Sequence, residues 1–82
     1  MKTQRNMGGF IYNVESPSVF VYAAAPEISL RYVGHNVWRI FDRDRPYDGD
    51  MTRYPSRIAA AEGLARLAQV AQDMLDSEHH KV

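Results

Sequence analysis

The sequence contains no cysteine, which excludes a disulfide framework and a thiolate metal site. No apolar run approaches the roughly 18 residues that a membrane-spanning helix needs, and the polar start of the chain is not followed by an apolar leader. The 10 basic residues are balanced by 10 acidic ones, so the chain has no net basic charge for gripping phosphates. These absences predict a soluble, cytoplasmic protein without membrane contact.

The composition that is present is typical of one small globular domain. The chain has 82 residues, of which 45% are hydrophobic and 24% are charged. A domain of this size buries only about 60% of its unfolded surface, so association with a partner would add useful stability. We expect a single domain over 1–82, with residues 1–9 and 78–82 frayed.

The most regular stretch predicts a helix from Ser56 to Ser77. Pro55 keeps the preceding residue extended, and Ser56 can cap the first turn. At 100° per residue, the apolar positions fall on one arc, namely Ala60, Ala61, Leu64, Leu67, Ala68, Ala71 and Leu75. The pattern therefore indicates an amphipathic helix with one core face.

Runs rich in β-branched and aromatic residues precede this helix, with turn sequences between them. They lie at 10–14, 19–23, 28–33 and 37–41, with a shorter run at 51–54. The turn sequences are clearest at 15–18 and 34–36. The predicted fold class is α+β: an antiparallel sheet of four or five strands with one long C-terminal amphipathic helix packed across one face.

The first predicted hairpin, residues 10–23, is apolar on both faces. One helix can cover only one face of a sheet, so the other face needs a partner. This predicts a homodimer, with Tyr12, Phe20 and Tyr22 as the contacts between copies.

The region 39–57 is rich in arginine. Residues 31–57 carry six arginines against four aspartates, a net charge of +2, whereas residues 58–82 carry two basic and four acidic residues, a net charge of −2. Arginine and tyrosine are residues that interfaces favour. The predicted partner-binding residues are Arg39, Arg43, Arg45, Tyr47, Asp48, Asp50, Arg53 and Arg57.

Catalytic and metal-binding patterns are missing from the chain. A calcium loop that began at Asp42 would have Pro46 at a ligand position and Arg53 in place of the final glutamate. His35 has no ligand or nucleophile at a useful spacing, and Ser56 has no glycine-flanked turn around it. The sequence therefore predicts neither an enzyme, a metal site nor a cofactor.

The order of strands, loop and helix over residues 29–71 resembles the arm-binding domain of phage tyrosine integrases. The matching residues are Arg43 and Arg45 in the loop and the segment Pro55-Ser56-Arg57-Ile58-Ala59 at the helix start. In that family a three-stranded sheet enters the major groove of DNA. The resemblance implies nucleic-acid binding through the arginine-rich region 39–57.

The aspartates between these arginines point to a protein partner instead. Asp42, Asp44, Asp48 and Asp50 oppose a phosphate backbone but suit a mixed-charge protein surface. The first function hypothesis is therefore a non-catalytic protein-interaction module, such as a phage or mobile-element accessory or inhibitor protein that masks a surface of a partner complex. The alternative hypothesis is a nucleic-acid-binding domain.

Overall fold

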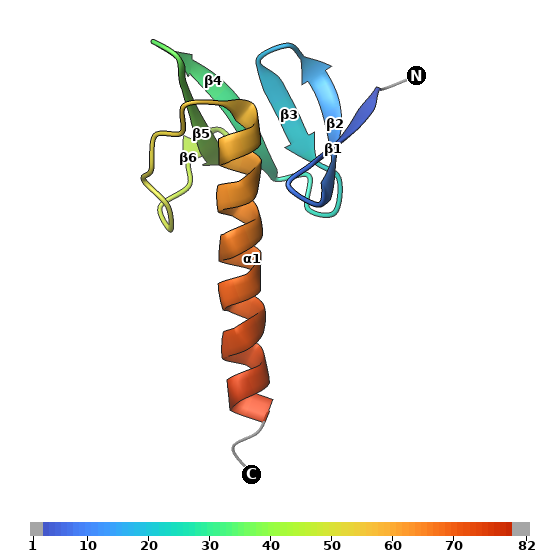
Figure 1. The fold of residues 1–82 in the computed structure, drawn as a ribbon, viewed down its shortest axis with the longest axis vertical. Coiled ribbons are helices and arrows are strands. Elements are labelled where there is room, and N and C mark those ends of the chain that lie inside the picture. The colour runs from blue at the N-terminus through green and yellow to red at the C-terminus, as the bar shows by residue number, and fades with distance from the viewer. Residues whose placement is uncertain (1–2, 80–82) are drawn as a thin grey trace.

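In the computed structural model, residues 3–79 are described, and side chains are described as far as residue 70. The strands are β1 (Gln4–Met7), β2 (Phe10–Ser16), β3 (Val19–Tyr22), β4 (Ile28–Gly34), β5 (Val37–Asp42) and β6 (Arg45–Pro46), and the helix is α1 (Arg57–His79). The strands form one antiparallel sheet in sequence order, with α1 on one side (Figure 1). The α+β class and the single C-terminal helix are confirmed, but the sheet has six strands, not four or five.

Residues 1–9 were expected to fray, but Gln4–Met7 form strand β1, and residues 1 and 2 lie outside the described part. Strand β1 pairs with β2 through a two-residue turn in which Gly8 and Gly9 have φ angles of 61° and 90°. A Cβ atom on Gly8 would lie only 3.0 Å from the carbonyl carbon of Ala61, so the turn sits directly against α1. Met7, 3% exposed, anchors this strand. One buried residue in a polar segment gives too little alternation to predict a strand.

The expected fraying of residues 78–82 can be checked only at residues 78 and 79, because residues 80–82 lie outside the described part. Residues 78 and 79 are the last residues of α1. Only the first half of α1 lies over the sheet, and the rest of the helix runs past it (Figure 1). Within residues 3–79, no helix is both long and apolar enough to cross a membrane.

The last strand lies at Arg45–Pro46 and not in the run 51–54. Tyr54 forms only an isolated bridge with Trp38, in which their backbones exchange hydrogen bonds of 2.7 and 2.8 Å. The turn expected at 34–36 is confirmed: His35 and Asn36 link β4 to β5 with φ angles of 54° and 58°. A two-residue turn with both φ angles positive matches the twist of a hairpin.

The core lies between α1 and one face of the sheet. Directly paired residues share a face, so Phe20, Leu30 and Ile40 form a row across β3, β4 and β5. Ala60 and Ala61 are fully buried, and their small side chains let the helix backbone approach this row closely. The remaining buried hydrophobic residues are Met7, Tyr12, Tyr54 and Leu64.

This arrangement corrects the residues predicted for self-association. Tyr12 and Phe20 are 0% and 2% exposed, and they lie on the face that α1 covers. Tyr22 is half-buried beside them, with its ring centroid 5.6 Å from that of Tyr12. Tyr12 and Phe20 therefore belong to the core, whereas Tyr22 is only partly buried against it, and its part in a contact between copies stays a prediction. Alternation divides a strand into two faces but does not tell which face the helix covers. The homodimer itself stays a prediction.

Candidate interaction surface

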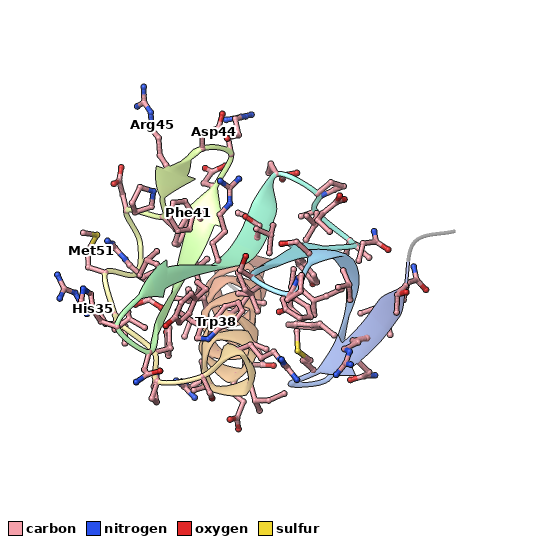
Figure 2. The ribbon with its side chains drawn as sticks, turned by 90° about the horizontal axis from the view of Figure 1, so that it is seen from above. His35, Trp38, Phe41, Asp44, Arg45 and Met51 are labelled. Carbon is pink, nitrogen blue, oxygen red and sulfur yellow. The ribbon has the colours of Figure 1, made fainter. Side chains whose placement is uncertain are left out.

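The face of the sheet opposite α1 is not covered by any helix or strand in residues 3–79, and we call it the open face. Phe41 and Trp38 of β5 lie on opposite sides of the sheet, with Trp38 on the side of the helix (Figure 2). The open face consists of Ile11, Asn13, Val19, Val21, Ser29, Arg31, Arg39 and Phe41, as the strand register shows. Its centre therefore combines aliphatic, aromatic and guanidinium groups.

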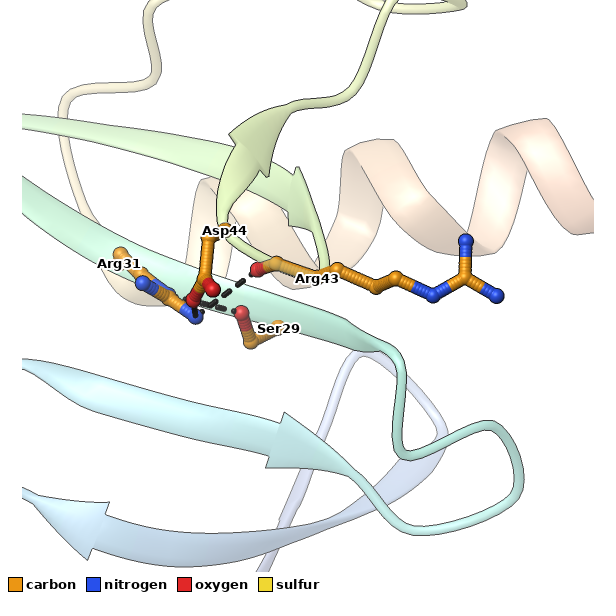
Figure 3. A network of polar contacts seen from close by, with 4 residues as sticks. All are labelled: Ser29, Arg31, Arg43 and Asp44. Carbon is orange, nitrogen blue, oxygen red and sulfur yellow. Dashed lines mark hydrogen bonds and ion pairs between the residues drawn. The ribbon is translucent and has the colours of Figure 1, made fainter.

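Arg31 is held in a fixed position at the centre of the open face. Its Nε donates to Ser29 Oγ at 3.1 Å, and its Nη2 donates to the Arg43 carbonyl at 2.9 Å (Figure 3). Its guanidinium carbon lies 4.9 Å from the centroid of the Phe41 ring. The ion pair with Asp44, at 3.6 Å, adds little because the Asp44 side chain is 97% exposed. Arg31 is therefore ordered by contacts within the described chain.

Arg31 was not among the candidate residues predicted from sequence, although it lies at the centre of the open face. The available signal was its place in β4, between Leu30 and Tyr32, where alternation puts it on the face opposite the core. The aromatic and the carbonyl that hold it come from β5 and from the turn after β5, 10 and 12 residues along the chain. Sequence spacing alone does not reveal these contacts.

Arg43 and Arg45 lie at the tip of the β5–β6 hairpin. Arg43 fixes the turn through its backbone: its N–H donates to the Glu27 carbonyl at 2.6 Å, and its φ angle is 57°. Its side chain points away from the Arg31 network (Figure 3), and Arg45 extends outward from β6 (Figure 2). Both arginines are exposed, as is Asp48. The tip thus presents exposed charges next to the ordered centre.

Three other predicted site residues belong to the core side. Tyr47 packs against the core and lines a small groove with Ile28, Leu64 and other apolar residues. The Arg57 guanidinium carbon lies 5.5 Å from the centroid of the Phe20 ring, beneath the sheet. Asp50 is bound by Tyr54, as described below. The eight predicted residues are therefore divided among the open face, the hairpin tip and the core side, and they do not form one site.

Asp50 holds the connection between β6 and α1. Its carboxylate accepts hydrogen bonds from the Thr52 N–H at 2.9 Å and from the Tyr54 hydroxyl. Burial alone would raise the pKa of Asp50, but these hydrogen bonds outweigh burial and lower it. Burial raises the pKa of Tyr54, and the bond to the Asp50 carboxylate raises it further. Asp50 therefore has a structural role, and its replacement would test the fold before it tested binding.

The lowered pKa of Asp50 predicts a loss of stability in acid. The folded state favours the carboxylate, so its stabilising contribution is complete above the unfolded pKa of about 3.9 and is lost as pH falls through the lower folded value. We expect thermal melts of Asp50→Asn to show a lower Tm than the unmodified protein at neutral pH. The difference in Tm between the two proteins should become smaller below about pH 4. A constant gap across this range would contradict the ionised hydrogen-bonded arrangement.

The last two predicted residues lie near one another beside the β4–β5 turn. Arg39 is on the open face, and its Nη2 donates weakly to Met51 Sδ at 3.5 Å. Arg53 is exposed and lines the same hollow as Arg39. Among the described residues, no group of three or more His, Asp or Glu side chains is placed to hold a metal ion.

Comparisons with known proteins found no matching family model, no matching curated protein and no matching solved structure.

Proposed function

We propose that this protein is a non-catalytic interaction module whose open face binds another protein. The observation that carries the proposal is a preordered arginine, Arg31, beside apolar side chains on the open face of the sheet. Arginine and aromatic residues are enriched at the centres of protein interfaces, where an immobilised side chain costs less entropy on binding. Val19, Val21 and Phe41 supply apolar surface around this arginine.

The exposed charges at the β5–β6 tip complement this centre. Arg45, Asp44 and Asp48 are solvated, as rim residues of an interface usually are. Charges of both signs steer a partner and select its orientation more than they add affinity. The proposed role is to mask or recruit a surface of a partner complex, as phage and mobile-element accessory proteins do.

The proposal is tested by affinity purification of the tagged full chain from its native host, with nuclease treatment. Ile11 and Ile58 provide a matched pair, because they are 42% and 46% exposed but lie on the open face and on α1 respectively. We expect a protein partner to survive nuclease treatment and to be lost with Ile11→Glu, because a charge on the open face would be buried without a partner. Ile58→Glu should retain it.

Two results would overturn this proposal. Capture that disappears on nuclease treatment would show that nucleic acid bridges the contact. Loss of the partner with Ile58→Glu but not with Ile11→Glu would place the interface on the helix. Circular dichroism of both variants confirms that each is folded before binding is compared.

Nucleic-acid binding is the alternative, and the exposed guanidinium groups of Arg43 and Arg45 favour it. If these groups contact phosphates, the logarithm of the association constant should fall linearly with the logarithm of salt concentration. Replacing each arginine by alanine should reduce that slope by about one unit or less. Asp48→Ala should then strengthen binding by removing repulsion, whereas for a mixed-charge protein contact it should weaken binding.

A further inference from the structure

A hollow of about 250 Å³ lies at the end of the open face, next to the turn between β4 and β5. We call it the arginine pocket, and its lining residues are Val33, Gly34, His35, Val37, Arg39 and Arg53. Two arginines and a histidine thus line it, and no acidic residue does. Figure 2 shows His35 and Met51 on this side of the molecule. The pocket is electrostatically suited to an anionic group.

Arg39 is an arginine of this pocket whose hydrogen-bonding groups are only partly satisfied. Its Nε is buried and has no hydrogen-bond acceptor among the described residues. The one hydrogen bond observed for its guanidinium goes to a thioether sulfur, which is a weak acceptor. A buried donor without an acceptor is costly, and the cost is larger for a charged group. An anion that binds the part of the Arg39 guanidinium lining the pocket would offset this cost through its charge.

The strand register adds a second reason. Arg39 lies directly opposite Arg31 on the neighbouring strand, and like charges in that position destabilise a sheet. Arg31 has acceptors of its own in Ser29 Oγ and the Arg43 carbonyl, whereas Arg39 has neither. Within the described residues, only Arg31 of this unfavourable pair is hydrogen-bonded to oxygen acceptors. Such an arrangement is compensated when a ligand neutralises the second member.

We propose that the arginine pocket binds a carboxylate side chain from an acidic segment of the protein partner. This inference rests on the proposed function, because it assigns the chemistry that the partner presents at one end of the open face. A planar guanidinium fork matches a carboxylate, and Arg39 and Arg53 together offer several donors. The glutamate or aspartate would enter between the aliphatic walls formed by Val33 and Val37.

The surroundings favour a peptide over a nucleic acid. Val33 at the pocket wall and Met51 beside the pocket are 45% and 63% exposed, so exposed apolar surface adjoins the charged site. A nucleic-acid strand would need a series of phosphate contacts along the surface, but exposed aspartates follow at the hairpin tip. One open cationic hollow with apolar margins fits one acidic side chain with apolar neighbours.

The test is an NMR titration of the full chain with two capped tripeptides, Val-Glu-Val and Val-Gln-Val. We expect saturable shifts of the Val33 and Val37 signals with the glutamate peptide, and binding at least about tenfold weaker with the glutamine peptide. Arg53→Gln should reduce binding by a similar factor and, because Arg53 is exposed, should not disturb the fold. Arg39→Gln should also reduce binding by a similar factor. Arg5→Gln, on the distant edge strand β1, is the control and should bind normally.

Inorganic phosphate and a short single-stranded oligonucleotide serve as competing probes. Saturable binding of the oligonucleotide or of phosphate at these signals, without binding of the glutamate peptide, would overturn the proposal in favour of a phosphate site. Equal shifts from both tripeptides, or none from any probe, would also overturn it. In either case the capture experiment with Ile11→Glu tests the proposed function independently. Absence of peptide binding in the pocket is therefore distinguishable from failure of the proposed function.

Discussion

Replacing Leu64 by alanine is expected to lower the free energy of unfolding by about 2–5 kcal/mol, the usual range for a buried leucine. Leu64 is 8% exposed and joins α1 to the core formed by the sheet. Alanine would leave a cavity, because the close approach of Ala60 and Ala61 prevents the helix from moving inward to fill it. For a domain of this size such a loss is a large part of the total stability.

Denaturant melts of three variants would check this expectation. Glu62→Ala is the control, since Glu62 is exposed on the same turn of α1. Leu67→Ala should fall between the two, because Leu67 is half-buried near the point where α1 leaves the sheet. Equal and small decreases in the free energy of unfolding for all three variants would mean that α1 does not pack on the sheet as described.

The sequence predicted those parts of the fold whose signal is local and periodic. The arc through Ala60, Ala61 and Leu64 predicted the buried side of α1, and alternation in β4 and β5 predicted their hairpin. Strand β1 was missed because only Met7 is buried in it and its pairing depends on the two-glycine turn. The covered face was missed in β2 and β3 because Ile11 in β2 and Val19 and Val21 in β3 put apolar side chains on the open face as well.

The candidate site was harder to predict because its members depend on contacts that are distant in sequence. Tyr47 and Arg57 looked like surface residues in a charged segment, but aromatic packing draws both to the core side. Arg31 joins the site only through Phe41 and the Arg43 carbonyl. The residue types in region 39–57 led to the prediction of an arginine-rich binding surface. Tertiary packing determines which of these arginines lie on the same surface.

Gly63 shows how closely the connection before α1 is fitted to the helix. A Cβ atom at this position would overlap the hydroxyl and the ring of Tyr54. Tyr54 cannot easily yield, because its backbone is paired with Trp38 and its hydroxyl is bound to Asp50. Tyr54 is also 7% exposed, so moving its ring would disturb its packing in the core. Glycine inside a helix normally costs about 1 kcal/mol relative to alanine, and here the close contact with Tyr54 explains its presence.

Gly63→Ala is therefore expected to destabilise the protein by about 1–3 kcal/mol, the cost of overpacking, although the same change in an exposed helix would stabilise it. The double variant Gly63→Ala with Tyr54→Leu separates the two effects. Tyr54→Leu alone should be destabilising because it removes the bond to Asp50 and part of the core, but adding Gly63→Ala to it should cost little or even restore stability. Denaturant melts of the four proteins give this coupling energy directly. Simple additivity, or stabilisation by Gly63→Ala alone, would show that the Tyr54 ring does not lie on α1 at this position.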